Sequence, residues 1–127
     1  MIEERDTVQK VLIVDDAAFM RLSIKNMLSK YNLEIAGEAS NGVMGVEMYK
    51  SLRPDVVTMD ITMPEMSGIE ALKAIKAFDP KAKVIMVSAM GQESMVKEAI
   101  ISGAKTFIVK PFKEDFLYQT ISRVLGI

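Results

Sequence analysis

Short apolar runs alternate with longer segments of helical periodicity along the whole chain. Most of the runs are rich in valine and isoleucine and apolar at successive positions, which is typical of strands buried on both faces. The predicted strands cover residues 8–14, 33–39, 54–59, 84–87 and 106–109. Apolar residues three or four positions apart predict helices over residues 17–30, 41–52, 69–78, 92–101 and 115–125. The chain is therefore expected to contain five strand–helix units in succession.

This alternation indicates an α/β fold. Strands buried on both faces belong to a parallel sheet that is covered by helices on both sides. Right-handed crossovers distribute the helices over the two faces, which gives a (βα)5 doubly wound parallel five-stranded sheet. We expect residues 1–8 to be an N-terminal leader and residues 9–127 to form one domain, since a chain of 127 residues suits a single core.

Polar residues gather where the predicted strands end. Asp15 and Asp16 follow the first strand, Asp60 the third, Ser88 the fourth and Lys110 the fifth. In an open α/β sheet, ligands bind outside the carboxyl ends of the strands, where the strand order reverses. If the first and third strands are neighbours there, the three carboxylates converge within a few ångströms. A single aspartate at a strand end is most often a turn or capping residue, but five polar residues at four strand ends favour a site.

The residue types at these strand ends favour phosphoryl chemistry. The chain has no cysteine and no histidine, which excludes thiol and imidazole catalysis. Three clustered carboxylates repel one another, and Mg²⁺ is a hard cation that would neutralise them. A metal, a lysine and a hydroxyl can stabilise a transferring phosphoryl group, and a carboxylate can itself be the nucleophile that forms an acyl phosphate.

The overall charge excludes two classes of partner. Sixteen basic and 17 acidic residues give a net charge of −1, so neither a nucleic-acid partner nor a membrane-surface partner is expected. No apolar run approaches the ~20 residues of a transmembrane helix. The first six residues are charged and precede only a short apolar run, which does not fit a signal peptide. We therefore expect a cytoplasmic protein.

Four blocks of the chain, in their order and spacing, resemble the motifs of response-regulator receiver domains. The blocks are Val11-Leu12-Ile13-Val14-Asp15-Asp16 with Arg21, Asp60-Ile61-Thr62-Met63-Pro64 with Gly68, Ser88-Ala89, and Lys110-Pro111-Phe112. The resemblance covers nearly the whole chain and is nearest to the CheY-type chemotaxis response regulators. It implies that residues 9–127 form a receiver domain with a flavodoxin-like, CheY-like sheet in the strand order 2-1-3-4-5.

The resemblance also implies a phosphoacceptor and a metal site. Asp60 would accept a phosphoryl group from a phosphohistidine on a CheA-like sensor histidine kinase. Asp15 or Asp16, together with Asp60 and the backbone carbonyl of Thr62, would hold Mg²⁺.

Three further residues would translate phosphorylation into a signal, if the resemblance holds. Lys110 would pair with the phosphoryl group, and the Ser88 hydroxyl would move in to bond one of its oxygens. Phe107, at the switch position, would then turn inward. Output would be contact with a protein such as the flagellar motor switch, a phosphatase being a further partner, and the domain would not turn over an external substrate.

Three alternatives differ in what they require of the chain. It could be the receiver fragment of a larger regulator, such as a transcription factor or a methylesterase. An aspartyl phosphatase would carry Asp-x-Asp after the first strand and a cap domain, whereas Asp15 and Asp16 are adjacent and the chain has no room for a cap. A flavodoxin-like cofactor binder needs a loop that attracts phosphate after the first strand, and two carboxylates there would repel it.

Overall fold

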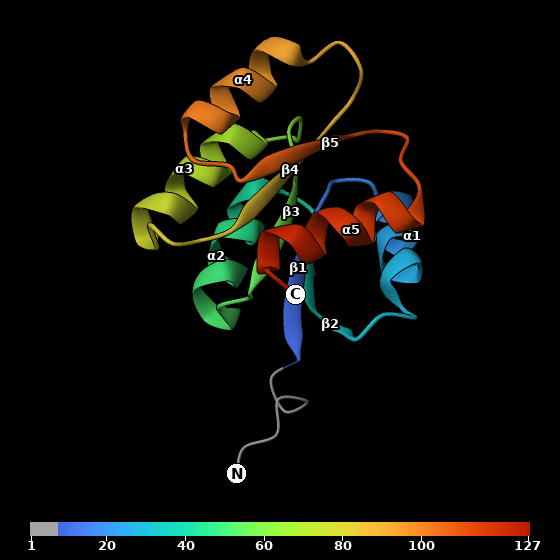
Figure 1. Cartoon of the computed structure of the whole chain (residues 1–127). Coiled ribbons are helices and arrows are strands. Elements are labelled where there is room, and N and C mark those ends of the chain that lie inside the picture. The colour runs from blue at the N-terminus through green and yellow to red at the C-terminus, as the bar shows by residue number, and fades with distance from the viewer. Residues whose placement is uncertain (1–7) are drawn as a thin grey trace.

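The computed structural model describes residues 8–127, in which five strands alternate with five helices (Figure 1). The expected leader, apart from Val8, lies outside the described residues. The strands are β1 (Gln9–Val14), β2 (Leu33–Ala39), β3 (Val56–Asp60), β4 (Val84–Ser88) and β5 (Thr106–Val109). The helices are α1 (Ala18–Leu28), α2 (Gly42–Leu52), α3 (Gly68–Phe78), α4 (Glu93–Ile101) and α5 (Glu114–Leu125). None of these helices is long and apolar enough to cross a membrane.

The strands form one parallel sheet in the order β2-β1-β3-β4-β5, which confirms the expected topology. From β1 the chain goes first to β2 at one edge of the sheet. It then crosses to β3 on the other side of β1 and continues to β5 at the opposite edge, so the strand order reverses between β1 and β3. The carboxyl ends of β1 and β3 therefore lie side by side, and this is the place in an open α/β sheet where ligands bind.

Helices cover the two faces of the sheet unequally. Helices α2, α3 and α4 lie on one face, and α1 and α5 lie on the other (Figure 1). Side chains of β1 alternate between the two cores: Leu12 and Val14 pack towards α2 and α3, whereas Val11 and Ile13 pack towards α1 and α5. All four are buried, which explains why the strand is apolar at each position from Val11 to Val14.

The start of α3 is fixed close to the end of β3. Ser67 and Glu70 form a reciprocal capping box, in which each side chain accepts a hydrogen bond from the other residue's backbone N–H. Gly68 passes so near β3 that a Cβ atom there would lie 2.0 Å from the backbone oxygen of Asp60. A glycine is therefore required at this point, and the loop that follows Asp60 is held tightly against the sheet.

Candidate functional site

The three aspartates come together at the point where the strand order reverses. Asp60 is the last residue of β3, and Asp15 and Asp16 directly follow β1. One carboxylate oxygen from each residue lies within 4.8 Å of the other two. Asp15 and Asp60 are buried and Asp16 is exposed, so the cluster has a buried floor and an open side.

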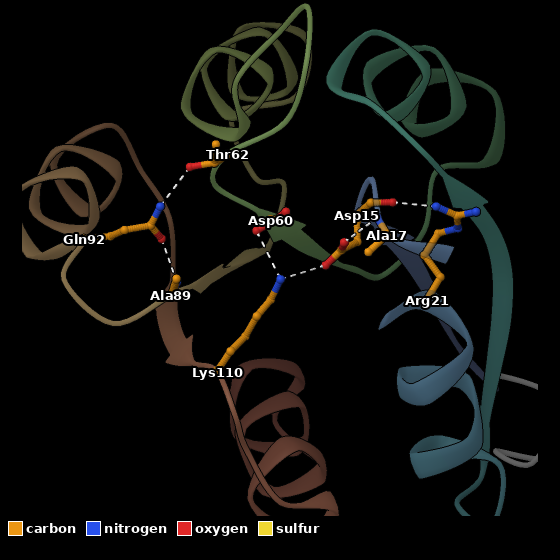
Figure 2. Close-up of polar contacts among 8 residues, drawn as sticks. All are labelled: Asp15, Ala17, Arg21, Asp60, Thr62, Ala89, Gln92 and Lys110. Carbon is orange, nitrogen blue, oxygen red and sulfur yellow. Dashed lines mark hydrogen bonds and ion pairs between the residues drawn. The ribbon is translucent and has the colours of Figure 1, made fainter. Parts of the chain in front are cut away.

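Lys110 reaches this cluster from the end of β5. Its Nζ lies 3.2 Å from Oδ2 of Asp15 and 3.5 Å from Oδ1 of Asp60 (Figure 2). Its backbone N–H donates to the carbonyl of Ser88 at 2.8 Å, which continues the pairing of β5 with β4 beyond the strand end. Three carboxylates and one ammonium leave a local charge of −2 when all are ionised.

A second layer of contacts orients Asp15. The backbone N–H of Ala17 donates to Oδ1 of Asp15 at 2.9 Å, and Nη1 of Arg21 donates to the backbone carbonyl of Asp15 at 2.7 Å (Figure 2). Arg21 is itself held by Glu38, 3.2 Å from its Nε. A hydrogen bond from Lys25, supported by Arg21, keeps the pKa of Glu38 below its ordinary value, so Glu38 stays ionised. The acidic turn is thus anchored to α1 and β2.

Electrostatics make Asp60 the unusual member of the cluster. Burial, followed by the negative charge of Asp15, raises the pKa of Asp60 to about 6, although Lys110 opposes this rise. The carboxylate of Asp60 is therefore less stable than an ordinary one and gains from any nearby positive charge.

The donor set fits a magnesium ion. Mg²⁺ prefers oxygen ligands and is usually held by one or two carboxylates, waters and substrate phosphates. The oxygens of Asp15, Asp16 and Asp60 converge, and a divalent cation would cancel the charge of −2 that Lys110 leaves. A cation there would also relieve the repulsion that raises the pKa of Asp60.

Ser88 and Phe107 lie on one apolar groove between α4 and β5. The groove has a volume of about 580 Å³. Ser88 is buried at the end of β4, the strand next to β3, whereas Phe107 is 42% exposed. Met90 and Ile101, both exposed, line the same groove. A movement of Ser88 would therefore change the space next to Phe107.

One residue that the sequence analysis did not single out contacts the loop that follows Asp60. The side-chain amide of Gln92 donates from Nε2 to the hydroxyl of Thr62 at 2.8 Å, and its Oε1 accepts the backbone N–H of Ala89 at 2.6 Å (Figure 2). Thr62 and Gln92 are 30 positions apart in the chain. Nothing in the local sequence signals such a contact, because it depends on how two loops approach each other.

Comparison with known proteins shows close relatives. Residues 11–122 match the sequence profile of the response regulator receiver domain. The chain is 59% identical over 117 residues to the chemotaxis protein CheY of Bacillus subtilis, and the alignment covers 92% of this chain and 98% of that protein. It is 58% identical over 116 residues to the chemotaxis protein CheY of Thermotoga maritima, and that alignment covers 91% of this chain and 97% of that protein.

Solved structures give the same result. A CheX–CheY–BeF3–Mg²⁺ complex from Borrelia burgdorferi contains a chain with a TM-score of 0.89 and 40% identity, the alignment covering 97% of this chain and 94% of that one. The response regulator domain of Thermotoga maritima CheB has a TM-score of 0.86 and 38% identity, over 94% of this chain and 98% of that one.

Proposed function

Because the chain belongs to the response regulator receiver domain family, we propose that Asp60 is the residue that accepts the phosphoryl group. With its high identity to CheY proteins, the chain is a phosphorylatable chemotaxis response regulator. The observation that carries the assignment of Asp60 is its position: it is buried at the strand-order reversal, where Lys110 lies between it and Asp15, and its pKa is raised to about 6.

The proposed step is an in-line displacement at phosphorus. A carboxylate oxygen of Asp60 attacks the phosphoryl group of a phosphohistidine and forms a P–O bond. The P–N bond breaks, and its electron pair returns to the imidazole nitrogen of the kinase, which then takes a proton from water. Hydrolysis reverses the change at Asp60: water attacks phosphorus, the bond to the carboxylate breaks, and inorganic phosphate leaves with a proton released to solvent.

This chain's residues prepare the site for that step. Asp15, Asp16, Asp60 and the backbone carbonyl of Thr62 are the proposed Mg²⁺ ligands, and the ion when bound supplies positive charge to the phosphoryl oxygens. Lys110 already lies between Asp15 and Asp60 and would follow the phosphoryl group as a second positive charge. Lys110 directly follows Val109, a residue of β5 that lines the groove, so the chain itself connects the site to the α4–β5 groove.

Ser88 and Phe107 are the proposed path from the site to a docking surface. A phosphoryl group on Asp60 adds acceptor oxygens next to the Ser88 hydroxyl, which gains a charge-assisted hydrogen bond only in that state. Its movement would open space into which Phe107 can turn from its half-exposed position. A coupling of ~1–3 kcal/mol is enough to change a population 5- to 150-fold.

The proposed partners follow from this cycle. A CheA-like histidine kinase supplies the phosphoryl group, and a component of the flagellar motor switch reads the altered α4–β5 surface. A phosphatase that removes the phosphoryl group is a third partner. CheY-type receiver domains are signalling proteins, and we propose that this one transfers its phosphoryl group only to water rather than turning over an external substrate.

Intact-mass measurement tests the phosphoacceptor. The protein is incubated with acetyl phosphate and Mg²⁺, and the wild type should gain one phosphoryl group whereas Asp60→Asn should gain none. Asp115→Asn, an exposed aspartate in the first turn of α5, is the matched control and should be labelled like the wild type. Equal labelling of wild type and Asp60→Asn, or labelling without a divalent cation, would contradict the proposal.

A motility assay tests Lys110 separately. Lys110→Ala should still bind Mg²⁺ but signal poorly in a bacterial strain whose own regulator is deleted, because the phosphoryl group loses its partner on β5. Lys113→Ala, which removes an exposed lysine three residues away, should signal normally. Normal signalling by Lys110→Ala would remove this lysine from the mechanism.

A further inference from the structure

The side chain of Gln92 joins two loops that follow neighbouring strands of the sheet. Through its amide it ties the loop after β4, at Ala89, to the loop after β3, at Thr62 (Figure 2). Gln92 is also the residue that precedes the first turn of α4, yet its side chain makes no capping hydrogen bond to that helix. The contact across the two loops, rather than the helix end, therefore accounts for its orientation.

The N–H of Ala89 belongs to a loop that begins next to Asp60 in the sheet. Ala89 follows the last residue of β4, and in the sheet Val87 lies opposite Asp60. The loop that carries this N–H thus begins beside the carboxyl end of β3. A backbone N–H at such a point is a strong donor to anionic oxygen, but here it donates to Oε1 of the Gln92 side chain.

We propose that Gln92 is a latch that holds the loop after β4 in its resting arrangement and competes with the phosphoryl group for the N–H of Ala89. This inference rests on the proposed function of Asp60. Phosphorylation must break the contact between Gln92 and Ala89 before the N–H can turn to a phosphoryl oxygen. The latch therefore stabilises the resting state and lowers the apparent affinity of the site for a phosphoryl group.

The size of the effect follows from the two hydrogen bonds. Both are made between uncharged groups at a solvent-exposed edge, where water competes for the same donors and acceptors. Removing the side chain should therefore tighten binding of a phosphoryl mimic by about two- to tenfold, the range expected for one net hydrogen bond. Because of the exposure, we expect a value near the lower limit.

Beryllofluoride, which mimics an acyl phosphate, provides the test. Wild type and Gln92→Ala are titrated with it in excess Mg²⁺, and the bound fraction is followed by NMR at backbone amides including that of Ala89. Gln92→Ala should bind about two- to tenfold more tightly.

Thr62→Val, which keeps the backbone but removes one of the two latch partners, should show a smaller gain. The double variant should bind no more tightly than Gln92→Ala alone, because both changes open the same latch. Gln119→Ala, an exposed glutamine on α5, is the matched control and should bind like the wild type.

Each other outcome contradicts the latch in a distinct way. Unchanged or weaker binding by Gln92→Ala overturns it, and slower hydrolysis of the acyl phosphate with unchanged binding would mean that Gln92 orients water instead.

Amide exchange gives a second readout without any ligand: the N–H of Ala89 should exchange faster in Gln92→Ala, and equal exchange would refute the resting contact. Failure of every variant, wild type included, to take up beryllofluoride would refute the function proposed for Asp60 and the latch with it.

Discussion

Replacing Asp60 by asparagine should make the metal-free protein more stable at neutral pH. Asparagine has nearly the same shape as aspartate but carries no charge. The carboxylate of Asp60 is buried and faces the charge of Asp15, and both effects disfavour its ionised form in the folded state. The variant removes this cost while Lys110 keeps its ion pair with Asp15 at 3.2 Å. A residue needed for signalling would thus be a source of instability.

The magnitude follows from the pKa. Burial and repulsion raise the pKa of Asp60 from 3.8 to about 6. Since a tenfold change in proton affinity is worth ~1.4 kcal/mol, the full effect would be ~3 kcal/mol. Asp16 leaves one side of the cluster open to water, which screens part of the repulsion, so we expect a gain of about 1–3 kcal/mol in the free energy of unfolding.

The pH dependence distinguishes this cause from a change in packing. A carboxyl whose folded pKa is raised binds its proton more tightly in the folded state, so stability falls as pH rises from about 4 to about 6 and stays low above that. The advantage of Asp60→Asn should therefore be complete at pH 8, about half as large at pH 5, and small at pH 4.

Urea denaturation in EDTA at these three pH values provides the measurement. Asp115→Asn should match the wild type at each pH. Adding Mg²⁺ should stabilise the wild type more than Asp60→Asn and so narrow the difference, because the ion binds only the folded cluster. An asparagine variant that is no more stable than the wild type at pH 8, or whose advantage is the same at pH 4, would refute this electrostatic reasoning.

Three further substitutions test other contacts in the domain. Thr58→Val should raise the free energy of unfolding by about 1 kcal/mol in urea denaturation, since the buried hydroxyl of Thr58 has no hydrogen-bond partner within residues 8–127. A loss of stability would show that this hydroxyl does have one. Tyr49→Phe removes the 2.7 Å hydrogen bond to Asp79 that keeps the pKa of that carboxyl below its ordinary value. The variant should have a lower free energy of unfolding than the wild type at pH 7. This loss should shrink below about pH 4, where Asp79 becomes protonated, and a loss that does not depend on pH would contradict the explanation. Gly68→Ala would place a Cβ atom 2.0 Å from the backbone oxygen of Asp60. It should therefore lower the midpoint of thermal unfolding sharply and abolish phosphorylation by acetyl phosphate. Normal labelling of the variant would show that the loop can move aside.

The fold could be predicted from the chain because its signals are local and repeated. Most of the strands are apolar at successive positions, and each helix has its own periodicity, so the alternation survives errors of one or two residues at the ends. Such errors did occur: Asp60 and Ser88 are the last residues of β3 and β4 rather than the first residues after them. The strand beginning predicted at residue 54 lies at Val56 instead, since Pro54 cannot donate to a sheet.

The site could be predicted only in part. The identities of Asp15, Asp60 and Lys110 follow from their places at strand ends, and their convergence follows from a parallel sheet with β1 beside β3. The pKa of Asp60 does not follow from the sequence, because it depends on burial and on a distance to another charge. The contact of Gln92 does not follow either, since two loops must first be placed by the sheet.

Two of the three donors proposed to receive a phosphoryl group on Asp60, Lys110 and the N–H of Ala89, already have partners in the structure. Lys110 is paired with Asp15, and the N–H of Ala89 is bonded to the side chain of Gln92. At these two donors phosphorylation would therefore exchange contacts instead of adding them to free groups, and each exchange is worth far less than a new contact made from nothing. The resting and active states then differ by a small free energy, which one covalent step can reverse. If those donors were free, the phosphorylated state would be favoured so strongly that hydrolysis would have to overcome all of the added contacts. Exchanging contacts therefore suits a regulator that must pass both from the resting to the active state and back.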